Sequence, residues 1–361
     1  MKKYISYILV IFMFFSFIAC SQKKVEDVKE KDNFDIKEAS VTVDKYVKLI
    51  KNEDYVSCNK LLSDNMKTKE EELTENELKI IGYKIMEMSE TNGEGEFKVG
   101  IIKSNLNIPE TIITESMITV IKKGMDYKID KIDNTVKKEI FYRDKMLRLR
   151  KEKEVDTNLV IDMQGLPKYA YSKDDKAKMK IQAVPKSNFG VIEFGYEGNK
   201  LAMTTFDVNT FVGILMLDDT MITQGNNEQN GQQSKQQESV GGKVLKEVPI
   251  GKQLLACDIL NNSQVEAMMF SMDEKFLAVQ YKTRDNSKRC MRVYSVTSGE
   301  LIPIMFEEEY PLNKVQVVFE EFQKEKILYK VISKTQIEKN NEYIGNWEMD
   351  LKEFKFKKIE K

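Results

Sequence analysis

The sequence predicts two folded parts: an α+β N-terminal domain, with helices packed on a curved antiparallel sheet, followed by an all-β C-terminal domain. Three observations predict this division. Apolar residues recur at helical spacing only in the first part, short strands separated by turns fill the second, and one strand–turn–strand pattern is repeated there. With 361 residues and 41% hydrophobic content, the chain can form about two hydrophobic cores.

The amino terminus has the pattern of a signal peptide over residues 1–19. Two lysines at positions 2 and 3 precede an apolar run over residues 5–19. This run is shorter than the roughly 20 apolar residues of a spanning helix. An ordinary secretory signal, or an uncleaved N-terminal anchor, is the alternative.

The end of the apolar run resembles the lipobox of bacterial lipoproteins. It reads Phe17-Ile18-Ala19-Cys20, with a small residue before the cysteine and two bulkier ones before that. The resemblance implies cleavage before Cys20 and a diacylglyceryl thioether on its sulfur. We therefore expect a lipid anchor in the cell membrane, with the mature chain on the extracytoplasmic face. Residues 20–35 are charged and are predicted to form a tether.

Residues 36–135 are predicted to form the α+β domain. Apolar residues at positions 43, 46, 47 and 50 have helical spacing and predict a helix within 36–64, with a break near residue 52. Residues 75–89 form either a third helix or a first strand. Strands are expected at 96–105, 111–122 and 126–133, the last two joined by a turn at Gly124.

This order, ending in a hairpin with Tyr127-Lys128-Ile129, resembles the nuclear transport factor 2-like cone fold. The resemblance implies a curved sheet folded around N-terminal helices. Family enzymes use acidic or histidine residues inside the cone, and none can be placed there, so no catalytic residue is carried over. Tyr46, Tyr127 and Ile129 are expected in the core.

Residues 136–154 are predicted to be a helical connector. They include several arginines and lysines, which could contact anionic lipid or cell-wall polymer. Interspersed acidic residues favour a solvated helix face instead.

Residues 155–361 contain an internal repeat. Residues 194–202 read FGYEGNKLA and residues 270–278 read FSMDEKFLA, so a phenylalanine precedes Leu-Ala by seven positions in both. A weaker third copy surrounds Phe319. Residues 224–242 are rich in Gln, Asn, Ser and Gly and are predicted to be a disordered insert.

The copy at 270–278 resembles a blade of a WD-repeat or TolB-like β-propeller. Met272 stands where the pattern has proline, Glu274 where it has glycine, and the Trp-Asp pair is missing. The resemblance implies a propeller-like domain of about four blades. A smaller open stack of β-sheets is the alternative.

The absence of histidine limits the chemistry. It removes the usual general base near neutral pH, the histidine-dependent catalytic triads and dyads, and histidine-containing zinc sites. We therefore predict that the chain is not an enzyme and uses no cofactor or metal. The net charge of −1 provides no excess of basic residues that would favour nucleic-acid binding. Acidic clusters, including those at 174–175 and 307–309, are predicted to be solvated turns.

Besides Cys20, the chain has three cysteines. Cys257 and Cys290 lie in one predicted domain and could form a disulfide, while Cys58 lies in the other. Three reduced structural cysteines are the alternative.

The predicted function is a non-enzymatic binding or scaffold role in the cell envelope, with an envelope protein or glycan as the partner. One alternative is a sensory or regulatory lipoprotein that binds a small apolar ligand in the N-terminal cone. Another is a cell-wall glycan enzyme with two carboxylates about 5–10 Å apart in one cleft.

Overall fold

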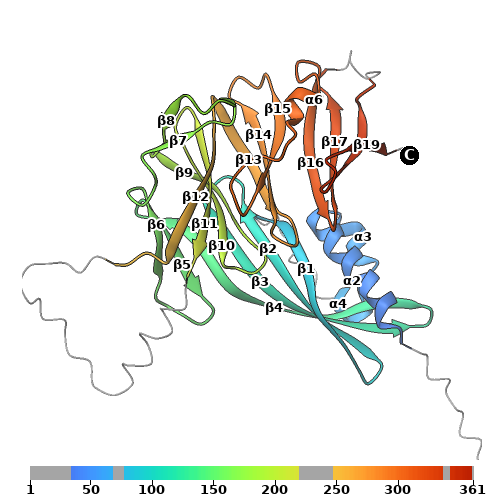
Figure 1. Cartoon of the computed structure of the whole chain (residues 1–361). Coiled ribbons are helices and arrows are strands. Elements are labelled where there is room, and N and C mark those ends of the chain that lie inside the picture. Colours follow the sequence, from blue (N-terminus) through green and yellow to red (C-terminus); the bar gives the residue numbers. More distant parts are fainter. Residues whose placement is uncertain (1–33, 68–76, 219–246, 336–341, 360–361) are drawn as a thin grey trace, which may run out of the picture.

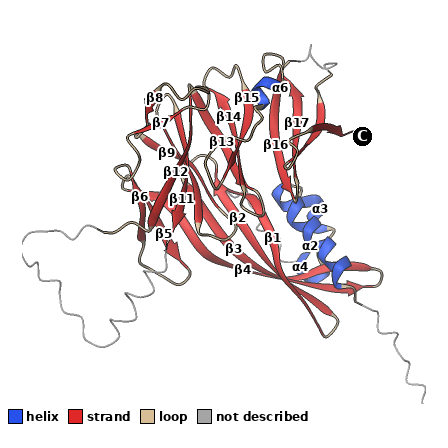
Figure 2. Ribbon diagram, in the orientation of Figure 1, coloured by secondary structure: helices blue, strands red, loops and turns tan. Residues whose placement is uncertain are grey.

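The computed structural model describes residues 34–67, 77–218, 247–335 and 342–359. Cys20, the predicted signal peptide, most of the predicted tether and the insert at 224–242 lie outside the described residues. The described helices are α2 (Ile36–Lys51), α3 (Tyr55–Asn59), α4 (Asp64–Lys67) and α6 (Phe306–Glu309). Nearly all other regular structure is β-strand (Figure 2).

The first sheet has six antiparallel strands in the order of the sequence. These strands are β1 (Leu78–Thr91), β2 (Glu94–Asn105), β3 (Glu110–Lys123), β4 (Asp126–Arg143), β5 (Met146–Lys151) and β6 (Asn158–Asp162). The predicted helical connector at 136–154 is therefore wrong, because these residues form the end of β4 and all of β5. Leu147 and Leu149 are buried and alternate with arginines, which is strand periodicity that the positive charge obscured.

The predicted α+β class is also wrong. In the part of the chain that the structure describes, α2 is the only helix longer than five residues, and the structure is mostly β in several antiparallel sheets. The ambiguous residues 75–89 form strand β1, and the sheet continues past residue 135, where the cone fold was expected to end.

Helix α2 begins at Asp35, whose carboxylate accepts hydrogen bonds from the backbone N–H groups of Lys37 and Glu38. Its start is held by Tyr127 of β4. The Tyr127 hydroxyl accepts a hydrogen bond from the Asp35 N–H at 2.7 Å, and its ring meets that of Phe34 edge to face. The prediction that Tyr46, Tyr127 and Ile129 are core residues is confirmed.

Three further sheets and a short ribbon follow (Figure 1). The ribbon is β7 (Tyr169–Tyr171) and β8 (Ile181–Ala183); the second sheet is β9 (Asn188–Phe194), β10 (Lys200–Phe206), β11 (Thr210–Leu217) and β12 (Gly251–Leu260). The third sheet is β13 (Ser263–Phe270), β14 (Phe276–Thr283) and β15 (Arg289–Ser295); the fourth is β16 (Val315–Gln323), β17 (Lys326–Ser333), β18 (Gly345–Asp350) and β19 (Phe356–Ile359).

The four sheets are stacked face to face. The second sheet shows this arrangement, because both of its faces are buried. Ile192, Phe194 and Met203 on one face pack with residues of the first sheet, such as Leu147. Ala202 and Val212 belong to a larger core that runs through the third and fourth sheets. The described residues after 155 therefore contribute three blade-like sheets rather than four, and the six-stranded sheet is the fourth member of the stack.

The internal repeat is confirmed as a structural repeat. Phe194 and Phe270 end β9 and β13, and the next strand begins six residues later in both copies. Gly198 and Glu274 occupy the same turn position with φ of +67° and +52°. Glu274 thus adopts the left-handed conformation that usually requires glycine.

No helix in the described part of the chain combines the length and apolar character needed to cross a membrane. Cys58, Cys257 and Cys290 are buried, and the disulfide considered for Cys257 and Cys290 is not formed.

Candidate functional site

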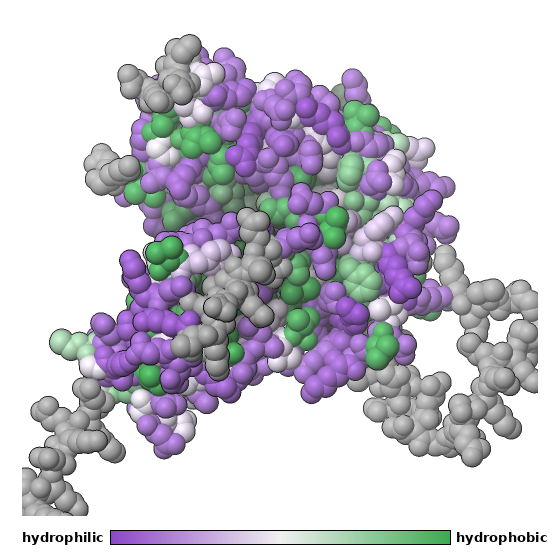
Figure 3. Space-filling view, turned by 180° about the vertical axis from the view of Figure 1, so that it is seen from behind, coloured by the Kyte–Doolittle hydropathy of each residue, from purple (hydrophilic) through white to green (hydrophobic). Residues whose placement is uncertain are grey.

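A cleft of about 250 Å³ lies where α2, the edge strand β1 and the turns of the other sheets converge. Seen from behind, the surface is hollowed between the upper and lower parts of the molecule, and hydrophobic residues gather along this hollow (Figure 3). The cleft is lined by Asp44, Lys48, Lys51, Ile81, Gly82, Tyr83, Tyr196, Met269, Met272, Glu321, Phe322, Gln323 and Lys324.

One wall of the cleft consists of polar groups that satisfy each other. The Tyr83 hydroxyl donates a hydrogen bond to the Asp44 carboxylate at 2.6 Å, and Lys48 Nζ lies 3.1 Å from the other carboxylate oxygen. Burial, with the Asp44 hydrogen bond second, raises the pKa of Tyr83 above its usual value. Tyr83, Asp44 and Lys48 therefore satisfy one another's hydrogen-bonding and charge requirements.

Lys51 differs from this wall. It is the last residue of α2, is half-buried, and makes no hydrogen bond or ion pair with any described residue. Burial lowers the pKa of its ammonium group, while Glu321 and Glu193 oppose this shift. Lys51 is thus a partly desolvated cation without a fixed counterion among the described residues.

Tyr196, from the turn between β9 and β10, also lines the cleft and lies against Gly82. A Cβ on Gly82 would clash with the Tyr196 hydroxyl, so glycine is needed for this approach. The β1–β2 register shifts between Ile80 and Gly82, and the extra residue, Ile81, packs into the large core of the later sheets. Burial raises the pKa of Tyr196, and Glu193 and Glu274 add to the shift.

A second cavity of about 210 Å³ lies on the other side of Tyr196. Its lining is more apolar, with Met86, Ile102 and Ile113 from the first sheet. Thr114 also lines it, and the Thr114 hydroxyl is buried without a hydrogen-bond partner among the described residues. Tyr196 therefore lies between two cavities, each of which is lined by both charged and apolar residues.

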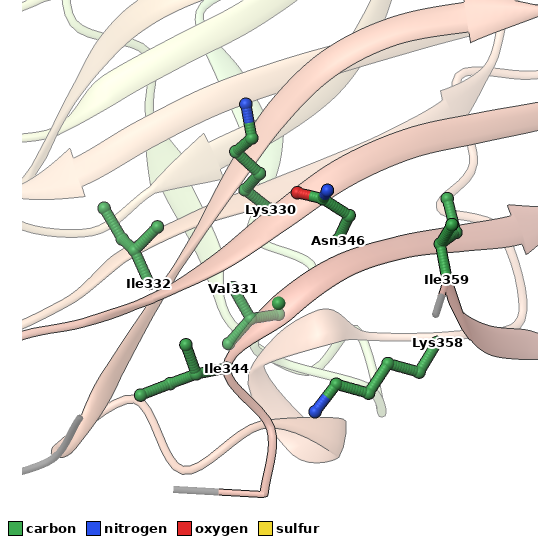
Figure 4. Close-up of a pocket in the computed structure, with 8 residues that line it drawn as sticks. Lys330, Val331, Ile332, Ile344, Asn346, Lys358 and Ile359 are labelled. Carbon is green, nitrogen blue, oxygen red and sulfur yellow. The ribbon is translucent and has the colours of Figure 1, made fainter. Parts of the chain in front are cut away.

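A third concavity lies over strands β17 to β19 of the fourth sheet. Figure 4 shows Val331, Ile332, Ile344 and Ile359 around it, together with Lys330 and Lys358. Residues 336–341, which join β17 to β18, lie outside the described residues. Its side chains offer two cations beside an aliphatic surface, and none of the described residues that line it is acidic.

One residue from each of two acidic clusters, the half-exposed Asp174 and the mostly buried Glu307, takes part in a polar network around Arg292. Arg292 on β15 is 5% exposed and pairs with Asp258 at 2.8 Å, Glu307 at 2.6 Å and Asp174 at 2.5 Å. Tyr294 donates to Asp258. The network joins the second and third sheets to α6, with three carboxylates around one guanidinium.

The sequence-predicted site residues are not brought together. Cys20 lies outside the described residues, and Cys257 and Cys290 are separate buried thiols. No group of three or more potential metal ligands occurs in the described ranges. Lys51 and Tyr196 were missed, because Lys51 is one lysine among many and nothing in the sequence shows that α2 lies beside the turn that holds Tyr196.

No family model matches the chain, and no curated protein matches it. Similar solved structures include β-propeller and peptidase-like proteins and a WD-repeat protein. A putative dipeptidyl aminopeptidase IV from Bacteroides ovatus is 11% identical, with a TM-score of 0.27 over 70% of this chain and 41% of its own. Sqt1 from Chaetomium thermophilum is 10% identical, with a TM-score of 0.27 over 73% and 78%. A prolyl endopeptidase is 10% identical, with a TM-score of 0.28 over 89% and 39%.

These structures correct the prediction that the chain is not an enzyme, because peptidases are among them. The absence of histidine removes particular mechanisms but not the whole class of enzymes. The chain spans about two fifths of the length of these peptidases. At such low identity and TM-score, the likeness carries no peptidase activity over to this chain.

Proposed function

We propose that the chain is a lipoprotein anchored at the extracytoplasmic face of the cell membrane, and that its folded part binds an envelope protein or glycan. The anchor rests on the lipobox-like residues that end at Cys20. The binding role rests on one observation, the half-buried Lys51, which has no hydrogen-bond or ion-pair partner among the described residues. Lys51 lines a cleft to which α2 and each of the four sheets, or the turns of these sheets, contribute residues.

The anchor is tested by metabolic labelling with a fatty-acid analogue. We expect the full chain to be labelled and to sediment with membranes, and Cys20→Ala to lose both properties. A Cys20→Ala chain that is still labelled would rule out the thioether. Two or more acyl chains are needed for a stable anchor, so partial release into the soluble fraction would indicate a single chain.

The binding role is tested by photo-crosslinking in intact cells. A photoreactive amino acid at Met272, which lines the cleft and is 44% exposed, should give a discrete crosslinked product. The matched control is Met179, which is 83% exposed and does not line the cleft. Lys51→Glu should abolish the Met272 product. Identical products from the two positions would contradict a partner site in the cleft.

The alternative of a small apolar ligand in an N-terminal cone stays a prediction. The space between α2 and the first sheet contains the chain's own buried side chains, including Val43, Phe97 and Ile118. This packing favours the cleft over the helix–sheet interior as the binding site.

A further inference from the structure

We propose that the cleft recognises a carboxylate attached to a small apolar body, with the carboxylate paired to Lys51. This inference deepens the proposed binding function by naming the chemistry that the cleft accepts. The carboxylate could belong to a free molecule or to the C-terminus of a peptide chain, and the experiment below separates these sources.

The charge balance of the cleft favours an anion. Asp44 is neutralised by Lys48, and Glu321 accepts a hydrogen bond from the Gln323 amide at 3.0 Å. Lys51 and Lys324 make no ion pair with a described residue, so the cleft presents two unpaired cations and one unpaired carboxylate. An anion beside Lys51 would offset the cost of its partial burial.

A single carboxylate fits the donors better than a phosphate. Two donors from partly buried lining residues are uncommitted: the Lys51 ammonium and the Tyr196 hydroxyl, which makes no hydrogen bond with a described residue. One cation and one hydroxyl match the charge and the two oxygens of a carboxylate. A dianion would exceed the net single positive charge that Lys51, Lys324 and Glu321 give the cleft.

The apolar residues that line the cleft determine which apolar group the ligand can carry. Ile81, Met269 and Phe322 are 7%, 8% and 4% exposed and present apolar surface beside these donors. The cleft volume of about 250 Å³ lies below the roughly 300–1,000 Å³ of sites for drug-sized ligands. The apolar body is therefore a short acyl chain or one apolar side chain, and octanoate is a suitable probe.

The test is calorimetric titration of the lipid-free mature chain with four probes. Octanoate is compared with octanamide, and N-acetyl-leucyl-phenylalanine with its C-terminal amide. We expect saturable binding of one carboxylate and none of its matched amide. Binding of octanoate alone identifies a free carboxylate, and binding of the dipeptide alone identifies a chain terminus.

Variants separate recognition from folding. Lys51→Gln should weaken carboxylate binding at least about tenfold, since hydrogen bonds to charged groups contribute about 1.5–3 kcal/mol. Lys51→Arg should keep it. Lys45→Gln is the matched control, because Lys45 is exposed on the same helix and does not line the cleft. Tyr196→Phe should weaken binding by up to about tenfold.

The pH profile gives a readout that a structural role would not change. Carboxylate binding needs protonated Lys51, and the pKa of Lys51 lies below its usual 10.5. As pH rises, binding should therefore be lost at a lower pH than if Lys51 had the pKa of an ordinary lysine. Lys51→Arg should retain binding to higher pH. Of the other groups around Lys51, Tyr83 and Tyr196 ionise above this range, Asp44 and Lys48 neutralise each other, and Glu321, Glu193 and Lys324 are unchanged in the variant.

Equal binding of acid and amide, an unchanged profile in Lys51→Gln, or no binding of any probe would overturn this inference. None of these results affects labelling at Cys20 or crosslinking from Met272. Absence of a Met272 product in the chain that keeps Lys51 would instead refute the partner site itself.

Discussion

Arg292 is the residue on which the polar network with Asp258, Glu307 and Asp174 depends. Its guanidinium is 5% exposed and faces Asp258, which is fully buried. Although burial alone would raise the pKa of Asp174, Arg292 holds it below its usual value. Removing the guanidinium would leave the Asp258 carboxylate buried without a counterion.

We expect Arg292→Met to lower the free energy of unfolding by about 3–5 kcal/mol, as when one partner of a buried ion pair is removed. Arg289→Met is the control, because Arg289 is 33% exposed and pairs with Glu266 alone among the described carboxylates; its loss should be about 1 kcal/mol or less. Urea denaturation measures both. Equal losses would show that the network adds no stability beyond a surface pair.

The three thiols should be unreactive in the folded protein. Burial, with the Asp258 charge second, raises the pKa of Cys257 to about 12, and burial also raises that of Cys290. Since the thiolate is the reactive form, a thiol reagent at pH 8 should label none of the three cysteines in native mature chain and all three in urea. Only one labelled thiol in urea, under non-reducing conditions, would instead indicate a disulfide.

At the scale of elements, the turns between strands hold the sheets together. Glu274 in the β13–β14 turn accepts a hydrogen bond from the Glu197 N–H at 2.7 Å and pairs with Lys200 at 2.5 Å. Glu197 lies in the equivalent β9–β10 turn, and Lys200 is the first residue of β10. One repeat therefore binds the turn of the preceding repeat, which fixes how adjacent sheets are placed.

A glycine pair tests this turn packing. Gly198 and Gly124 have nearly the same φ, +67° and +65°, but a Cβ at Gly198 would lie 2.9 Å from Ile113 Cδ1, while Gly124 has open space. Gly124→Ala should cost about 1 kcal/mol of stability from backbone strain alone. Gly198→Ala should cost more, measured by urea denaturation. If the two cost the same, the β9–β10 turn does not pack closely on the first sheet.

Several elements could be predicted from local pattern. Helix α2, strands β2 to β4 and the two strongest repeats follow from the spacing of apolar residues, and the structure confirms them. The strand at 146–151 was missed because its alternating leucines are surrounded by basic residues, which are equally common on helix faces. Local charge does not distinguish these two structures.

The cleft could not be predicted, for a different reason. Lys51, Gly82, Tyr196 and Phe322 are far apart in the sequence and meet only when the sheets are stacked. The same holds for Arg292 and its three carboxylates. Spacing within one segment carries no information about such long-range contacts.

At the scale of the whole molecule, a buried hydrogen bond links the N-terminal sheet to the repeats. Glu193 on β9 is 1% exposed and accepts a hydrogen bond from Ser104 on β2 at 3.0 Å. Burial raises its pKa well above the usual 4.5. The carboxyl group is therefore neutral in the folded chain at a pH where it would be ionised in the unfolded chain.

The raised pKa of Glu193 predicts a pH dependence of stability. Because the folded pKa of Glu193 is the higher one, its contribution is fully present below the unfolded pKa and is lost as pH rises through the folded pKa. Glu193→Gln removes that loss. The free energy of unfolding of the wild type, relative to the variant, should fall as pH rises above about 4.5, as measured by urea denaturation at several pH values. A constant difference would contradict a neutral buried carboxyl.

The clamp that Tyr127 forms with Phe34 and Asp35 has a mechanical consequence. A pull on the amino terminus reaches the Phe34–Tyr127 ring contact and the hydrogen bond from the Asp35 N–H before it reaches α2. Tyr127 lies at the start of β4, opposite Lys122 of β3, whereas β5 pairs with β4 only from Lys138 to Arg143. Tension is therefore passed to the β3–β4 ladder, at the end of the strand opposite to the one that β5 holds.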